Sequence, residues 1–130
     1  MSTAATQSVL RFVLLHPKSM PDESIAEWLA FVQRDVGEAA TVTTGRDDFM
    51  ANMKRCGGPM AWARSVAERF DGGIIPTSTG AVGRFTADIC EGFLARGKPV
   101  SQVDARGVAT RVGRITRTTG KSVDGWTVSP

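Results

Sequence analysis

A loop of small residues at positions 76–83 is the part of this sequence best suited to hold a ligand. Its hydroxyl groups can exchange hydrogen bonds with a bound molecule, and its glycines allow unusual backbone angles and close approach. An apolar helical pattern follows, and a helix N-terminus presents free N–H groups and partial positive charge that suit a phosphate. The spacing matches neither Gly-x-Gly-x-x-Gly nor a P-loop, so a turn that only joins two elements is the open alternative. The candidate ligand-binding residues of the loop are Thr77, Ser78, Thr79, Gly80 and Gly83.

Three aspartates are candidates for catalysis. Asp88 comes five residues after Gly83, in the first turns of the expected helix, and Asp47 and Asp48 follow an earlier β-rich run. A carboxylate that faces a ligand can act as nucleophile or base, and glycosidic chemistry commonly uses a pair of acids. The structural alternatives are equally simple. The helix dipole favours an acid at the position of Asp88, and Asp47 and Asp48 can cap the helix that begins there.

His16 is the only histidine of the chain, and it ends the first apolar run. Imidazole side chains in general change charge close to neutral pH, so this residue can transfer a proton or bind a ligand, although a histidine before proline also serves as an ordinary loop residue. Lys18 and Arg46 follow the first two apolar runs and are candidate ligand-binding cations. The two cysteines, Cys56 and Cys90, form no Cys-x-x-Cys pair, so the sequence predicts no metal site and no cofactor.

These candidates are positioned by alternating strand and helix patterns, which predict an α/β fold. The expected strands are 10–15, 40–44, 73–77 and 99–103, and the expected helices are 19–36, 47–55, 59–70 and 85–96. Strands separated by helical crossovers favour a doubly wound parallel four-stranded sheet with helices on both faces. A C-terminal β-hairpin is expected within 108–128. We therefore predict one Rossmann-like domain over 1–130, with a flexible leader at 1–8 and a hairpin extension at 104–130.

In an open parallel sheet, ligands bind outside the carboxyl ends of the strands, where the strand order reverses. The first three expected strands end at His16, Arg46 and Ser78. We therefore expect these three side chains to converge on one rim. The tryptophans Trp28 and Trp62 lie on apolar helical stripes and are expected in the core.

Composition and charge restrict the partners. The chain has 42% hydrophobic and 22% charged residues, no apolar run near the ~20 residues of a membrane span, and no secretory signal pattern, so a cytoplasmic protein is expected. The net charge of +3 is concentrated in 97–130, where six basic residues face two acidic ones. This segment can attract phosphate-bearing partners, with Trp126 as a platform for a nucleobase, or it is simply a solvated face.

Three segments resemble the nucleoside 2-deoxyribosyltransferase-like superfamily: Asp71-Gly-Gly-Ile-Ile-Pro-Thr, Gly83-Arg-Phe-Thr-Ala-Asp-Ile and Leu94-Ala-Arg-Gly-Lys-Pro-Val. The resemblance implies a Rossmann-like fold and a nucleoside or nucleotide ligand, with an acid on the helix that attacks the anomeric carbon. Asp88 stands at that position, where the family has glutamate, and Thr86 lies beside it as a ligand-binding candidate. The Gly-Pro that the family has after its first strand is His16-Pro17 here.

Three functions follow as hypotheses. The leading one is a domain that binds a nucleotide or nucleoside without turnover. An N-glycosidic hydrolase or transferase, acting on a nucleoside, nucleotide or NAD-like ligand, is the alternative. The third is a protein that binds a partner or nucleic acid through its basic hairpin. The hairpin is free to pair with the main sheet or with a second copy, so a homo-oligomer is also open.

Overall fold

The computed structural model describes residues 9–119 and 124–130. The expected leader at 1–8 and the residues 120–123, where the hairpin turn is expected, lie outside this description. The elements are β1 (Leu10–Leu14), α1 (Asp22–Val36), the 3-10 turn η2 (Gly37–Ala39), β2 (Ala40–Thr44), α2 (Gly45–Cys56), α3 (Pro59–Arg69), β3 (Gly72–Pro76), β4 (Ala81–Val82), α4 (Arg84–Ala95), β5 (Val100–Val103), β6 (Ala109–Arg111), β7 (Arg114–Thr119) and β8 (Asp124–Ser129).

The main sheet is mostly parallel, which confirms the predicted fold class. Its order is β2-β1-β3-β5-β6, and the first four of these strands pair in parallel. The apolar run of β3 is buried along its whole length, as expected for a central strand covered on both faces. The short strand β6 adds an antiparallel edge next to β5, so the sheet has five strands where the sequence predicted four.

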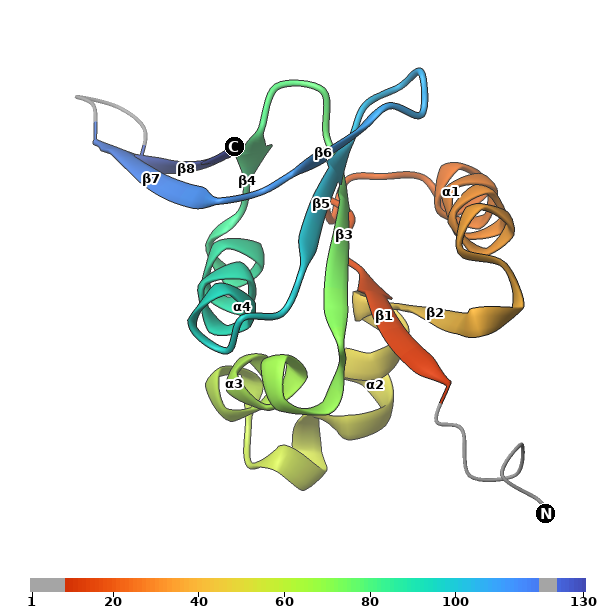
Figure 1. The fold of residues 1–130 in the computed structure, drawn as a ribbon. Helices are drawn as coiled ribbons and strands as arrows, with labels where there is room; N and C mark the ends of the chain where they lie inside the picture. Colours follow the sequence, from red (N-terminus) through yellow and green to blue (C-terminus); the bar gives the residue numbers. More distant parts are fainter. Residues whose placement is uncertain (1–8, 120–123) are drawn as a thin grey trace, which may run out of the picture.

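Helices cover both faces of this sheet (Figure 1). One face packs against α1 through a small apolar cluster built around Leu14, Val32 and Ile74. The opposite face packs against α3 and α4 through the larger cluster, in which Val66 and Phe93 are fully buried. The apolar stripes of the helices therefore decide which face of the sheet each helix covers.

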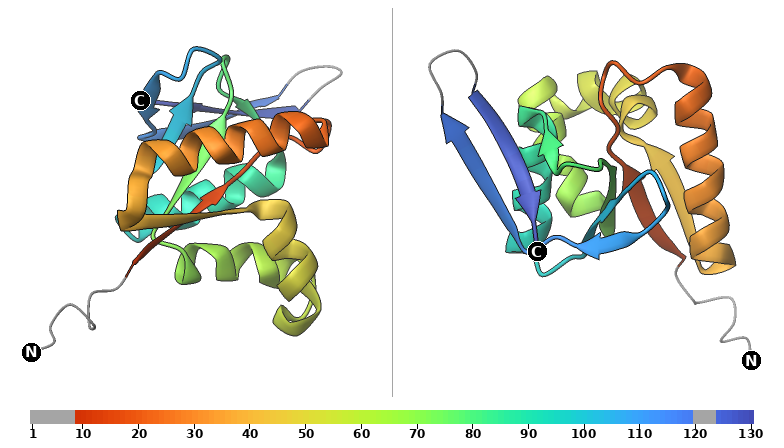
Figure 2. Two further views of the ribbon diagram at one scale, coloured as in Figure 1. Left: turned by 90° about the vertical axis from the view of Figure 1, so that its right-hand side faces the viewer. Right: turned by 90° about the horizontal axis from the view of Figure 1, so that it is seen from above.

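The C-terminal segment forms more structure than the expected hairpin. The strands β7 and β8 pair with each other, and β8 also pairs with the two-residue strand β4, which the sequence pattern did not indicate. This second, antiparallel sheet lies beyond α4, so that α4 contacts the main sheet on one side and β7 and β8 on the other (Figure 2). The hairpin thus pairs within this chain, through β4.

Helix α1 begins at Asp22, three residues later than expected. Residues 18–20 form a turn instead, in which the amide of Met20 donates to the carbonyl of Pro17 over 3.1 Å. Pro21 then stands at the cap with extended backbone angles, which suit the residue before a helix.

The outer edge of β2 is covered by a side chain of α1. The amide group of Gln33 accepts a hydrogen bond from the backbone N–H of Val42 over 3.0 Å and donates to the carbonyl of Ala40 over 2.9 Å. It also donates to the carbonyl of Gly37 over 3.2 Å. Gln33 therefore replaces a neighbouring strand at the edge of the sheet, where unpaired backbone groups otherwise invite other chains.

We expect Gln33→Ala to lower the free energy of unfolding by about 1 kcal/mol, because hydrogen bonds that are partly buried are lost without replacement. Gln33→Glu should lower it at least as much, since a carboxylate cannot donate to the two carbonyls. Urea unfolding measures the loss. Asp35→Ala, an exposed position on the same helix, is the control, and equal midpoints for Gln33→Ala and Asp35→Ala would show that the edge contact contributes nothing.

Candidate functional site

A cavity of about 210 Å³ opens where the strand order reverses. The chain leaves β1 through α1 toward β2 on one face and returns to β3 through α2 and α3 on the other. The connections therefore diverge at the carboxyl ends of β1 and β3, which is the point where sheets of this kind bind ligands. The residues that line this switch-point cavity are Leu15, Pro17, Ile75, Pro76, Thr77, Ala81, Val82, Gly83 and Thr86.

The N-terminus of α4 forms one wall of the switch-point cavity. Gly83 is the cap residue and supplies no side-chain hydrogen bond, and the first bond within the helix runs from the amide of Ala87 to the carbonyl of Gly83. The amides at positions 84–86 precede that first bond and have no carbonyl partner within the helix. These donors and the Thr86 hydroxyl make the wall suitable for an anion.

The loop after β3 uses most of its polar groups to hold its own shape. Thr77 Oγ1 accepts from the amide of Gly80 over 3.2 Å, and Thr79 Oγ1 accepts from the amide of Ala81 over 3.2 Å. Gly80 has φ +84°, and a Cβ there would lie 2.6 Å from the carbonyl oxygen of Val128. Of the five loop residues predicted to bind a ligand, Thr77 and Gly83 line the cavity, and Thr79 and Gly80 shape the loop. Ser78 is exposed.

The predicted catalytic acids lie away from this cavity. Asp88 is exposed on α4, and Asp47 is exposed in the first turn of α2. The cap of α2 is neither Asp47 nor Asp48 but Thr44, whose Oγ1 accepts from the amide of Asp47 over 3.1 Å. Within the described part of the chain, no carboxylate lines the switch-point cavity.

Asp48 is buried and fully engaged in contacts between α2 and α3. Its carboxylate accepts two hydrogen bonds from the guanidinium of Arg69, at 2.6 and 3.0 Å, and one from Trp62 Nε1 at 2.8 Å. Asn52 donates a further bond at 3.0 Å. Burial by itself would raise the pKa of Asp48, but these hydrogen bonds outweigh it and hold the pKa below its ordinary value. Asp48 therefore stabilises the fold as a carboxylate held by Arg69 and Trp62, and its oxygens are already engaged within the protein.

The rim residues come together in part. Arg46 and Asp22 form an exposed ion pair of 2.7 Å, and Arg46 lowers the pKa of Asp22, with a smaller contribution from His16. His16 Nδ1 lies 2.9 Å from the carbonyl oxygen of Pro17, and His16 Nε2 is buried without a partner among the described residues. Among the described residues, Arg46 is therefore bonded to Asp22, and no bond joins His16 to either of them. No hydrogen bond or ion pair among the described residues joins Ser78 or the exposed Lys18 to them.

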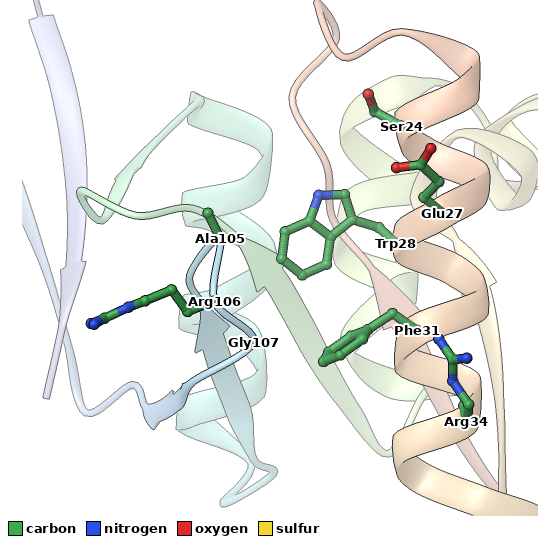
Figure 3. Close-up of a pocket in the computed structure, with 8 residues that line it drawn as sticks. All are labelled: Ser24, Glu27, Trp28, Phe31, Arg34, Ala105, Arg106 and Gly107. Atoms are coloured by element: carbon green, nitrogen blue, oxygen red, sulfur yellow. The ribbon is translucent and has the colours of Figure 1, made fainter.

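A second cavity, of about 470 Å³, lies between α1 and the turn that joins β5 to β6. We call it the α1 groove. Figure 3 shows the indole of Trp28 and the ring of Phe31 pointing from α1 toward this turn. Both tryptophans were expected in the core: Trp62 is buried there, and Trp28 packs against the smaller core cluster but is half-buried and also lines the groove. The residues that line the groove are Ser24, Glu27, Trp28, Phe31, Arg34, Ala105, Arg106 and Gly107.

Trp126 of the basic C-terminal segment packs against a neighbouring side chain. The guanidinium of Arg117 lies over the ring of Trp126, 5.7 Å from its centroid, so one side of the expected nucleobase platform is covered. Arg111 and Arg114 are exposed. The described residues contain no group of three metal-ligating side chains and no helix long and apolar enough to cross a membrane.

In comparisons with known proteins, no family model, no curated protein and no solved structure matches this chain. The function of the chain is therefore inferred from its α/β fold, with a mostly parallel sheet, and from the two cavities.

We expect Asp48→Asn to lower the free energy of unfolding by roughly 2–3 kcal/mol at pH 7, because the half-buried Arg69 keeps its charge and loses its partner. The pKa of Asp48 is lowered in the folded state, so its contribution is complete above the unfolded-state pKa of about 4 and is lost as pH falls through the lower folded-state value. Denaturant unfolding of both proteins at several pH values measures this. Asp47→Asn is the matched control, and an equal loss in both variants would contradict the assignment.

The two cysteines should differ sharply in reactivity. Burial raises the pKa of the Cys90 thiol to about 12, whereas Cys56 is half-buried with its Sγ 3.4 Å from Ser65 Oγ. At pH 8 we expect iodoacetamide to modify the folded protein once, and twice after unfolding in urea, as counted by mass spectrometry. Cys56→Ser should remove the modification of the folded protein, and rapid labelling of Cys90 in that variant would refute its burial.

Proposed function

We propose that this chain is a Rossmann-like domain that binds a nucleotide or nucleoside in the switch-point cavity. The single observation that carries the proposal is the position of this cavity, at the carboxyl ends of β1 and β3, with the N-terminus of α4 as a wall. This is also where the resemblance to nucleoside 2-deoxyribosyltransferase-like proteins would put the sugar of the ligand. The position of the cavity supports ligand binding at this place, and the sequence resemblance suggests the class of ligand.

The chemistry of the walls favours a sugar phosphate in this cavity. Leu15, Ile75 and Val82 give it apolar surfaces, while the Thr77 and Thr86 side chains and the first amides of α4 provide polar groups. A volume of about 210 Å³ is below the ~300 Å³ at which pockets for whole drug-sized ligands begin. We therefore assign the cavity to the phosphate and ribose of a nucleotide, with the base outside it.

The positions of Asp48 and Asp88 favour binding of the nucleotide without turnover. Cleavage of an N-glycosidic bond would need a carboxylate at the anomeric carbon. Asp88 lies outside the cavity lining, and Asp48 is held by Arg69 and Trp62. The sequence resemblance is therefore the only support for the glycosidic alternative, and the lining of the cavity adds none.

Substitution at Gly83 tests the proposal. A Cβ at this position meets no atom within 4 Å and the backbone is extended, so a side chain fits without strain. Gly83→Asp places a negative charge at the N-terminus of α4, which favours the helix but repels a phosphate. Gly83→Ala adds a Cβ with neither a charge nor a hydrogen-bond acceptor, leaves the first amides of α4 free, and is the control.

We expect at least one of AMP, GMP, CMP and UMP to raise the melting temperature of the wild-type protein, since a ligand that binds only the folded state stabilises it. The Ala variant should keep this shift, and the Asp variant should lose it at an unchanged or higher melting temperature of its own. A wild-type protein that responds to none of the four nucleotides would refute the proposed function. An Asp variant that responds like the wild type would refute the position of the phosphate.

A further inference from the structure

We propose that the α1 groove holds the base of the nucleotide, as a flat aromatic ring placed against the indole of Trp28. This inference rests on the proposed function and extends it, because it assigns the part of the ligand that the switch-point cavity is too small to contain. The groove has more than twice the volume of that cavity, at about 470 Å³ compared with 210 Å³. Its aromatic and polar lining is also of the type that binds heteroaromatic rings.

The two aromatic rings of the groove form a preformed surface. Trp28 and Phe31 meet edge to face, with centroids 6.0 Å apart and planes at 84°. Gly107 fixes Phe31 from the other side, since a Cβ at this glycine would lie only 2.7 Å from Phe31 Cζ. Phe31 therefore lies between the turn and Trp28; both rings are half-buried, and the indole of Trp28 points into the groove (Figure 3).

Polar groups are available at both ends of the groove. The indole N–H of Trp28 donates to no described residue, in contrast to that of Trp62, which is bonded to Asp48. Glu27 lies beside Trp28 on the exposed side of α1, and neither Glu27 nor Arg34 forms an ion pair with a described residue. Glu27 can accept hydrogen bonds from the N–H groups of a base, while Arg34 adds a positive charge further along the helix. Ser24 and Arg34 mark ends that are roughly 15 Å apart along α1, enough length for a base and part of its sugar.

The turn opposite α1 is held rigid by Asp104. Its Oδ1 accepts from the amides of Arg106 and Val108 over 2.9 and 3.0 Å, and the amide of Gly107 donates to the Asp104 carbonyl over 2.9 Å. The hydrogen bonds from Val108 and Arg106 lower the pKa of Asp104. The Arg106 side chain extends away from α1 (Figure 3), and its guanidinium lies 3.7 Å from Asp104 Oδ2. The wall that faces Trp28 is thus formed by Ala105 and by backbone.

The groove and the switch-point cavity lie on adjacent strands. The amide of Thr77, which lines the cavity, donates to the carbonyl of Val103 over 3.0 Å, and Ala105 of the groove comes only two residues later. Two residues of extended chain reach about 7 Å, and paired strands are about 4.8 Å apart. The two sites therefore lie near the same edge of the sheet, on opposite faces, and the proposed nucleotide crosses the carboxyl ends of β3 and β5.

Calorimetric titration with ribose 5-phosphate and with AMP, GMP, CMP and UMP separates the two parts of the ligand. We expect wild-type protein to bind its preferred nucleotide at least tenfold more tightly than ribose 5-phosphate, since stacking on an aromatic side chain adds affinity for a base. Trp28→Leu should remove this advantage and leave the affinity for ribose 5-phosphate unchanged. Trp28→Phe, which keeps a flat ring, should retain most of the advantage.

A second variant avoids any loss of packing by Trp28. Ala105→Leu fills the groove from an exposed turn and should also reduce nucleotide affinity about tenfold without changing that for ribose 5-phosphate. Ala109→Leu, at an exposed position of β6 outside the groove, is its control.

The possible outcomes separate the two proposals. If wild-type protein binds neither the nucleotides nor ribose 5-phosphate, the proposed function fails and this inference fails with it. If it binds a nucleotide no better than ribose 5-phosphate, or if Trp28→Leu and Ala105→Leu bind the nucleotide like the wild type, only the assignment of the base to the α1 groove is overturned.

Discussion

The central position of β3 is the constraint on which the rest of the structure depends. This strand lies between β1 and β5 with both faces covered, and the two glycines at its start make this possible. A Cβ at Gly72 would lie 2.5 Å from the carbonyl oxygen of Pro99 and 2.8 Å from the ring of Phe12, and one at Gly73 would lie 3.1 Å from the ring of Phe93. Larger residues would push apart the strands and the helix α4. Both cavities are positioned by this packing, since β3 ends at one of them and fixes, through β5, the turn that lines the other.

Polar side chains connect the layers around this apolar centre, and several belong to the segments that resemble deoxyribosyltransferase-like proteins. Asp71 Oδ2 accepts from the amide of Arg11 over 2.8 Å, which joins the start of β3 to β1. Lys98 Nζ donates to the carbonyls of Ala67 and Phe70, over 2.7 and 2.9 Å, and so caps the C-terminus of α3. Asp71, just before β3, and Lys98, just before β5, both belong to the segments that carry the resemblance. Their hydrogen bonds stabilise the contacts between strands and helices. Such residues can recur wherever this arrangement recurs, whatever the ligand.

Sequence patterns predicted the parts of the fold that depend on local periodicity. The four parallel strands and the helices were found because each is long enough to show an apolar period of its own. The two-residue strand β4 and the three-residue strand β6 were missed, because strands this short are stabilised by the strands they pair with and not by their own sequence. The switch-point cavity was anticipated from topology, and Thr77, Gly83 and Thr86 do line it. The burial of Asp48 was not anticipated, since it depends on Arg69, a residue 21 positions away.

Trp28 shows why the α1 groove had no signal in the sequence. Its spacing on α1 is that of a core residue, and Trp62 has the same kind of pattern and is buried. The difference arises opposite each residue: Trp62 meets α2 and the carboxylate of Asp48, whereas Trp28 meets a turn of small residues that leaves space beside the indole. That turn is already ordered by Asp104, and Phe31 is already fixed by Gly107. Ordering the protein around a ligand in the groove therefore costs little free energy. Under this condition even a modest aromatic contact contributes to the affinity.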